Sequence, residues 1–138
     1  MVTIEELVRE LHQEAGATRR VLERIPEDQL EWRPHPKSMA MGQLALHVAS
    51  LPTGIVEIST WPKFDIMMEH PRPAPATLGE VLETLDRGVA DAAASLSRMD
   101  DAELAQPWRM VRGDDEVMTI PRGALFRAVL FNHWYHHR

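Results

Sequence analysis

The stretch TIEELVRELHQEAGATRRVLERI, residues 3–25, has the pattern that decides the fold. Apolar or small side chains recur in it every three or four residues, which is the spacing of one face of an α-helix. Thr3 followed by Glu6 also predicts a capping box, in which each side chain accepts a hydrogen bond from the other residue's backbone N–H. We therefore expect a helix from about Thr3 to Arg24, whose core-facing stripe consists of Ile4, Leu7, Val8, Leu11, Ala15, Thr18, Leu22 and Ile25.

A second helix is predicted after a proline-rich stretch. Three prolines within residues 26–36 forbid a continuous helix there, because proline lacks a backbone donor and restricts the residue before it. Ser38 is then a candidate N-cap for the next helical segment. Pro52 and Gly54 interrupt that segment, and we expect them to kink the helix rather than end it. Its stripe consists of Ala40, Leu44, His47, Leu51 and Ile58, with Val48 and Ile55 beside it.

A long connection and two more helices follow. The connection WPKFDIMMEHPRPAPAT, residues 61–77, contains four prolines and several large apolar side chains, which we expect to pack on another part of the protein. Thr77 and Glu80 repeat the capping-box pattern, and Pro121 suits the first turn of a final helix. Between these helices, VRGDDEV at residues 111–117 is a candidate hairpin. The third stripe contains Leu78, Val81, Leu82, Leu85, Val89, Ala92 and Leu96, and the last contains Leu125, Phe126, Val129, Leu130, His133 and His137.

These four amphipathic segments predict an all-α fold, namely a four-helix bundle whose longest connection joins helices two and three. A chain of 138 residues fits one domain, residues 1–138, and can bury a sufficient core without disulfides or a structural metal. A bound metal would therefore have a functional role rather than a structural one.

Composition excludes several classes of function. The chain contains no cysteine, which removes thiolate metal clusters and cysteine nucleophiles and leaves histidine and carboxylates as metal ligands. Its net charge of −6 disfavours nucleic-acid binding, which depends on basic side chains. The acidic start lacks the features of a signal peptide, and no run approaches the ~18–20 apolar residues of a membrane span. We expect a cytoplasmic protein that acts on a small molecule and does not contact membranes.

Three histidines are the strongest candidates for chemistry. His133 and His137 lie four residues apart, so that on a helix they share one face and can bind one ion. They continue the Phe126 and Leu130 stripe, which we expect to face the bundle interior, and His47 has the same relation to its own helix. The alternative interpretation is that these are core histidines or part of an exposed polar tail. Such spacings also arise by chance in a chain with seven histidines.

Other side chains offer weaker evidence. Glu14 lies at the edge of the first stripe and is a candidate general base, although an exposed helix carboxylate is the commoner case. Arg138 is a candidate for binding an anionic substrate group, and the alternative is a solvated arginine at the chain end. Trp32 and Trp134 could line a pocket or simply belong to the core. The methionines are first interpreted as adaptable packing residues: Met39, Met41, Met67 and Met68.

Two segments resemble the DinB family, including its YfiT-type, bacillithiol-transferase-like members. They are LERIPEDQLEWRPHPKSMAMGQLALHVASLP, residues 22–52, and LFNHWYHHR, residues 130–138. The order and separation of these pieces carry the resemblance, which covers essentially the whole chain. Members of the family usually continue past the matching histidines with Gly-Gln and further helical turns. This chain departs from the pattern there, because it ends at Arg138.

The resemblance implies an up-down-down-up four-helix bundle with a divalent metal bound by His47, His133 and His137. His136 matches a neighbouring family histidine that is not usually a ligand, although an i,i+3 pairing with His133 is geometrically possible. Zinc and nickel both suit imidazole ligands. The resemblance also implies a homodimer and, in the thiol transferases, a low-molecular-weight thiol such as bacillithiol or mycothiol.

Three hypotheses of function follow. The first is a metal-dependent enzyme, either a thiol S-transferase or a hydrolase, in which the three-histidine site keeps one coordination position open to activate a thiol or water. The second is a protein that binds a metal or small ligand without turnover. The third is a stress-response interaction protein on the same bundle.

Overall fold

Four helical segments dominate the structure. The computed structural model describes residues 2–138, in which the long helices are α1 (Ile4–Leu22), α2 (Met41–Ser59) and α3 (Leu78–Ser97). The fourth segment is a continuous helical run made of α5 (Arg122–Leu125), the π-helical η2 (Phe126–Phe131) and α6 (Asn132–His137). Helix α3 packs against α1 and α2, and the C-terminal run packs against α2 and α1. The prediction of a mainly helical fold is confirmed.

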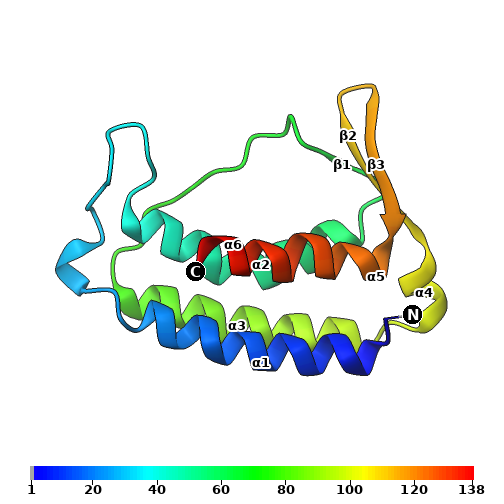
Figure 1. Cartoon of the computed structure of the whole chain (residues 1–138), viewed down its shortest axis with the longest axis horizontal. Helices are drawn as coiled ribbons and strands as arrows, with labels where there is room; N and C mark the ends of the chain where they lie inside the picture. The colour runs from blue at the N-terminus through cyan, green and yellow to red at the C-terminus, as the bar shows by residue number, and fades with distance from the viewer. Residues whose placement is uncertain (1) are drawn as a thin grey trace.

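The direction of each helical segment can be followed by colour in Figure 1. Helix α1 runs toward the left of the view, α2 and α3 run toward the right, and the C-terminal run returns to the left. Short helices lie between these segments: the 3-10 helix η1 (Glu27–Gln29) precedes α2, and α4 (Asp101–Ala105) follows α3. Within residues 2–138, no helix combines the length and the apolar character needed to cross a membrane.

The predicted features of α1 are confirmed. Thr3 Oγ1 accepts a hydrogen bond from the Glu6 N–H at 3.2 Å, and Glu6 Oε2 accepts one from the Thr3 N–H at 3.0 Å. This capping box satisfies backbone donors that have no partner within the helix. The helix ends at Leu22, two residues before the expected Arg24. Its fully or almost fully buried residues belong to the predicted stripe: Leu7, Leu11, Thr18 and Leu22.

The prediction that Ser38 caps α2 is wrong. The N-cap is Ala40, whose side chain carries no acceptor. The first donors are satisfied in other ways, since the Ala40 N–H donates to Gln43 Oε1 at 3.0 Å and the Met41 N–H donates to the Trp32 carbonyl at 2.8 Å. The loop before the helix therefore replaces a capping side chain.

Helix α3 begins where it was predicted. Thr77 is its N-cap and accepts a hydrogen bond from the Glu80 N–H at 3.1 Å. The Glu80 carboxylate does not complete the expected reciprocal box, because it accepts from the Ala76 N–H instead, at 2.7 Å. Pro121 is likewise one position away from its predicted place: it ends the preceding strand and acts as the N-cap, and the final helix begins at Arg122.

A small sheet contradicts the all-α expectation. Strands β2 (Pro107–Arg112) and β3 (Asp115–Pro121) form the hairpin that VRGDDEV predicts, with its turn at Gly113, whose φ of 59° suits glycine. The third strand, β1 (Phe64–Asp65), comes from the connection between α2 and α3 and pairs in parallel with β2. Two strand residues in a long connection show no sequence period, so this third strand could not be predicted locally.

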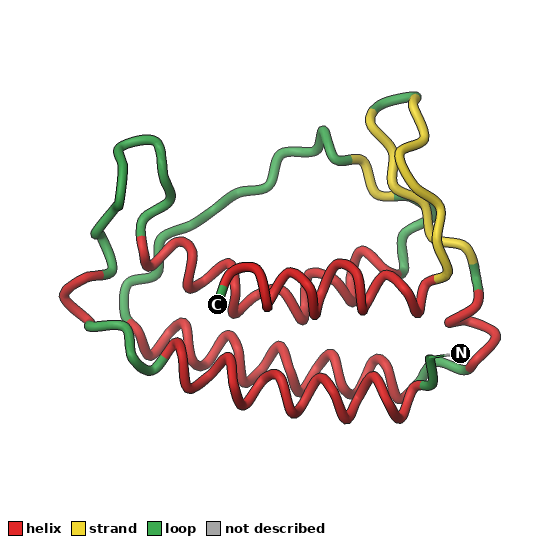
Figure 2. The backbone as a smooth tube through the Cα atoms, in the orientation of Figure 1, coloured by secondary structure: helices red, strands yellow, loops and turns green. Residues whose placement is uncertain are grey.

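Most of the sheet and of the connection lies beside the helices. Figure 2 shows the strands in yellow at one end of the molecule and the rest of the connection in green, arching past α2 and the C-terminal run. Trp108 of β2 joins this sheet to the helices, since it is 1% exposed and its Nε1–H donates to the Ile58 carbonyl at 2.9 Å. The expected packing of the connection is confirmed for Phe64, which packs against the core, whereas Met67 and Met68 are exposed.

Candidate metal centre

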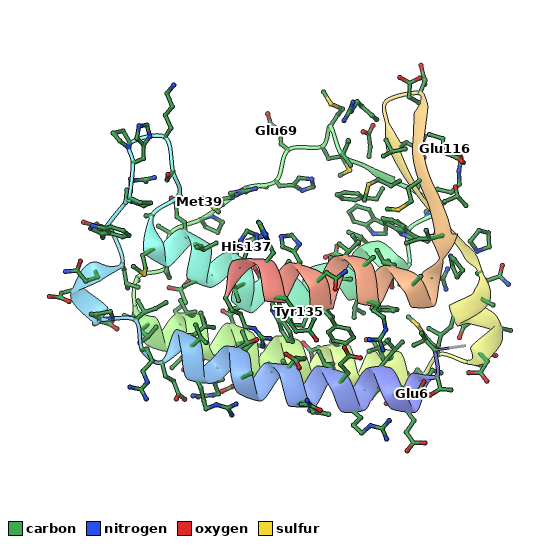
Figure 3. All side chains as sticks on the ribbon, in the orientation of Figure 1. Glu6, Met39, Glu69, Glu116, Tyr135 and His137 are labelled. Carbon is green, nitrogen blue, oxygen red and sulfur yellow. The ribbon has the colours of Figure 1, made fainter. Side chains whose placement is uncertain are left out.

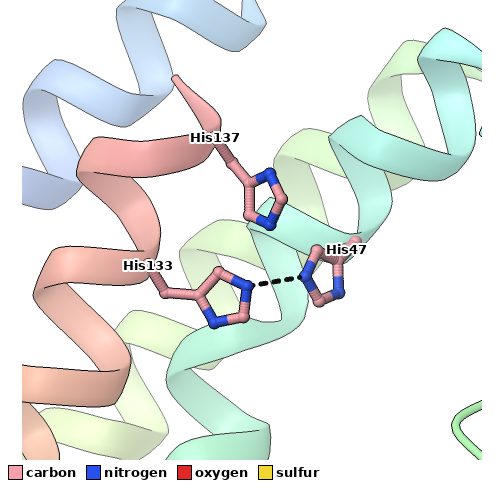
Figure 4. A group of neighbouring side chains, drawn as sticks. All are labelled: His47, His133 and His137. Atoms are coloured by element: carbon pink, nitrogen blue, oxygen red, sulfur yellow. Dashed lines mark hydrogen bonds between the residues drawn. The ribbon is translucent and has the colours of Figure 1, made fainter.

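The three candidate histidines come together between α2 and α6. One ring nitrogen from each of His47, His133 and His137 lies within 4.8 Å of the other two. The Nε2 atoms of His47 and His133 are 3.2 Å apart. Figure 4 shows the three imidazoles converging, with His47 on one helix and the other two a turn apart on the facing helix. The sequence prediction that these residues form one cluster is confirmed.

This geometry fits a divalent ion such as zinc. Imidazole nitrogens bind zinc at ~2.0–2.1 Å, so two ligands of a tetrahedral site lie about 3.3–3.4 Å apart. The 3.2 Å between His47 and His133 is close to this separation. His137 also offers a ring nitrogen within 4.8 Å of the other two. The donor set is neutral and nitrogen-only, as three-histidine zinc sites are.

The electrostatics of the cluster favour neutral imidazoles. The pKa of His47 is lowered from 6.5 to about 4, mainly by burial and in addition by the neighbouring His133 and His137. Burial is also the main cause that lowers the pKa of His133 and of His137, followed by their histidine neighbours. Ligation requires the deprotonated ring, so the site holds the metal-binding form at neutral pH.

The histidines do not share the core-facing stripe that the sequence predicted for them. Phe126, Leu130 and Trp134 are fully buried, whereas His133 and His137 are partly exposed and line a cavity together with Val129. The final helix therefore has two distinct faces: one packs in the core and the other lines the cavity. The π-helical turn at Phe126–Phe131 ends immediately before α6, and π-helical turns are frequent at functional sites.

A hydrogen bond between helices aligns the two halves of the cluster. Pro52 lies inside α2, which continues past it to Ser59, and proline has no N–H to donate to the carbonyl of Val48 four residues earlier. The Nε1–H of Trp134 donates to that carbonyl at 2.9 Å. Val48 follows His47 and Trp134 follows His133, so this bond ties α2 to α6 beside the histidines.

The histidines form part of the wall of a cavity of about 800 Å³. This volume lies in the range of small-molecule sites, ~300–1,000 Å³. The connection between α2 and α3 supplies much of the opposite wall, with Trp61, Phe64, Ile66 and Met68, and β2 adds Met110. Polar residues on the same lining are Ser50, Thr53, Glu57, Glu69, His70 and Arg72.

The structure brings Glu14 and Arg138 to each other. Arg138 Nη2 donates to Glu14 Oε2 at 2.6 Å, and its Nη1 donates to the Glu14 carbonyl and to Thr18 Oγ1, both at 3.2 Å. The two side chains are only 17% and 14% exposed. Neither residue is among those that line the cavity at the histidines. The commoner alternatives, an exposed glutamate and a solvated terminal arginine, do not describe this pair.

The remaining aromatic and histidine candidates lie elsewhere. Trp134 belongs to the core, Trp32 is half-exposed, and neither lines the cavity. His136 is exposed and stacks edge-on to His137 at 4.9 Å between ring centroids, so it lies beside the cluster without joining it. Among the methionines named from the sequence, Met68 lines the cavity.

Sequence reasoning missed two basic residues of the cavity, His70 and Arg72. Both lie in the connection, where they have no helical period that could relate them to the histidines. The signal that could have found them is the placement of EHPRP, residues 69–73, directly after the apolar side chains of the same connection. His70 stacks on Phe64 with ring centroids 5.4 Å apart.

Comparison with known proteins supports the family suggested by the sequence. A family model described as the DinB superfamily matches residues 10–138. The structure is similar to the crystal structure of a DinB-like protein from Bacillus cereus ATCC 10987, with a TM-score of 0.75 and 20% sequence identity. That match covers 99% of this chain and 86% of the other, and it supports the fold alone. No curated protein matches the chain. Because the family model spans most of its length, this chain belongs to the DinB superfamily.

Proposed function

We propose that this protein binds a divalent metal ion, zinc or nickel, through His47, His133 and His137. We further propose that it is a metal-dependent enzyme of the thiol S-transferase or hydrolase type. The observation that carries the proposal is the convergence of three ring nitrogens within 4.8 Å in the wall of an 800 Å³ cavity. The proposal includes the up-down-down-up order of the helices. It also includes a homodimeric assembly, which sedimentation would test.

The ion would supply Lewis acidity, lowering the pKa of a thiol or water at the coordination position that three ligands leave open. The residues of the chain supply the rest of the chemistry. The lowered histidine pKa values keep the imidazole lone pairs available at neutral pH. The apolar wall around Trp61 and Phe64 limits the water that competes with the substrate. We propose that the cavity takes a thiol such as bacillithiol or mycothiol together with its electrophilic partner.

Metal analysis tests the site directly. Protein purified without an affinity tag is expected to bind one equivalent of zinc or nickel, and His47→Ala is expected to lose most of it. His12→Ala is the matched control, because His12 is exposed on α1 and is not part of the cluster. Equal substoichiometric metal in the wild type and in His47→Ala would contradict the proposal.

Turnover tests the catalytic part. Metal-loaded protein is incubated with bacillithiol, mycothiol or glutathione and a small electrophile, and separately with ester and amide substrates. We expect turnover in one of these assays, and we expect His133→Ala to abolish it. Turnover that persists in His133→Ala would exclude the histidine site as its source.

One observation favours a second function, metal or ligand binding without turnover. Glu14, the general base that the sequence offered, is held by Arg138 and does not line the cavity. Stoichiometric metal binding without turnover in any of these assays would support this alternative.

A further inference from the structure

Arg72 lies in the wall of the cavity without a carboxylate partner. In the part of the chain that the structure describes, its one side-chain hydrogen bond goes from Nη1 to Met39 Sδ at 2.9 Å, and thioether sulfur is a weak acceptor. The ion pairs found among residues 2–138 involve other arginines. The guanidinium is therefore available to an anionic ligand.

The backbone of this segment is held in place. Gln43 Nε2–H donates to the Arg72 carbonyl at 2.8 Å, which fixes the residue to the first turn of α2. Pro75 is buried close to Gly42, where an added Cβ would lie 3.1 Å from the proline ring. Prolines at positions 71 and 73 restrict the backbone on either side of Arg72. An arginine on a backbone fixed in this way loses less entropy when it binds a ligand.

The charges around Arg72 favour the binding of an anion. Arg72 lines the same cavity as the three cluster histidines, so its positive charge acts on the metal centre. A divalent ion there would have only neutral ligands. The acidic residues of the cavity lining are Glu57, which lies ten residues or about 15 Å along α2 from His47, and Glu69, which points away from the helices in Figure 3. Neither balances the positive charge near the cluster.

The opposite wall of the cavity is apolar and partly flat. Phe64 stacks on His70 and on Trp108, with ring centroids 5.4 Å and 6.2 Å away. Ile66 and Met68 extend this surface along the connection. The cavity therefore offers a cation near the metal centre and an aromatic surface beside it.

We propose that Arg72 binds the carboxylate of the substrate, and that the substrates are small carboxylic acids with a flat apolar group that packs against Phe64. Arginine presents parallel N–H donors that match both oxygens of a carboxylate, which favours this anion for a single guanidinium. The inference rests on the proposed function only in treating the cavity as the substrate site.

Binding to the metal-free protein tests Arg72 separately from the metal. The protein is treated with a chelator, and calorimetry compares 3-phenylpropionate with its neutral analogue 3-phenylpropanamide. We expect the wild type to bind the carboxylate about tenfold more tightly than the amide, because hydrogen bonds to a charged group are the stronger ones. Arg72→Met should bind both compounds within about twofold of each other, and Arg72→Lys should retain part of the preference.

The matched control is Arg87→Met, because Arg87 is exposed on α3 and does not line the cavity. It should keep the full preference for the carboxylate. A preference that persists in Arg72→Met, or a wild type that binds neither compound, would overturn the inference. The result is different if only the proposed metal site is wrong. In that case His47→Ala leaves the metal content unchanged, while the preference for the carboxylate still depends on Arg72.

Discussion

Replacing Arg138 by methionine should destabilise the protein, because its side chain links the C-terminal helical run to α1. The side chain reaches α1, where it forms an ion pair with Glu14 and a hydrogen bond to the fully buried Thr18. Methionine keeps much of the length and apolar volume of arginine but removes the charge and its donors. The variant therefore leaves a Glu14 carboxylate that is only 14% exposed without its cation.

The magnitude follows from the burial of the pair. Breaking a fully buried ion pair by removing one partner costs ~3–5 kcal/mol, whereas an exposed pair contributes ~0–1 kcal/mol. Exposures of 17% and 14% place this pair nearer the buried case, and we expect a loss of about 2–3 kcal/mol in the free energy of unfolding. For a chain of this length the loss corresponds to a decrease in Tm of roughly 6–12 °C.

Urea denaturation followed by circular dichroism measures this loss, and Arg127→Met is the control. Arg127 pairs with Glu10, but its side chain is 46% exposed, so its removal should cost no more than about 1 kcal/mol. The double variant Glu14→Leu with Arg138→Met should recover much of the stability, because it leaves no buried charge without a partner. A loss of less than about 0.5 kcal/mol in Arg138→Met, equal to that of Arg127→Met, would refute the reasoning.

Three further predictions concern the metal centre and the packing at the start of α2. In the metal-free protein, the pKa of His47 is lowered from 6.5 to about 4, so the unfolded chain binds more protons than the folded one between these pH values. The free energy of unfolding should therefore decrease as the pH is lowered from 6.5 to about 4, and it should stay constant above pH 6.5. His47→Gln should flatten this slope in urea titrations. Metal affinity measured by competition with a chelator should weaken on acidification below about pH 6.5, since protonated imidazole does not bind metal, and a constant affinity from about pH 5 to 8 would argue against histidine ligands. Gly42→Ala should destabilise the protein by about 1–3 kcal/mol in thermal melts, because the added Cβ lies 3.0 Å from the Leu30 carbonyl oxygen and 3.1 Å from Pro75, while Gly54→Ala, whose Cβ meets nothing within 4 Å, should not.

The parts of the fold that were predicted from sequence are those with a local period. The stripes of α1 and α3, the hairpin turn at Gly113 and the i,i+4 pair of histidines can each be recognised within a few turns of chain. His47 could be added because it has an apolar stripe of its own and because the resemblance to the DinB family relates it to the C-terminal pair.

The missed features depend on contacts between distant segments. Ser38 was expected to cap α2, but the Trp32 carbonyl from the preceding loop satisfies the donor there. Strand β1 exists because Phe64 pairs with Met110, 46 positions later in the chain. Arg72 enters the cavity wall through a connection that has no regular period. Such features depend on how distant segments pack against each other, and this packing cannot be predicted from the local pattern of a single sequence.

Pro52 and Trp134 illustrate how such a contact constrains the changes that evolution or a design library can accept. Alanine at position 52 would be a better helix former, and its N–H would share the Val48 carbonyl, which can accept two hydrogen bonds, with the Trp134 indole. A phenylalanine at position 134 would instead leave that carbonyl without a donor while Pro52 is present. The two positions are therefore epistatic: phenylalanine at position 134 is costly beside Pro52 and less costly beside an alanine. Selection for helix stability at position 52 would then relax the constraint on Trp134, whose bond aligns His47 with His133.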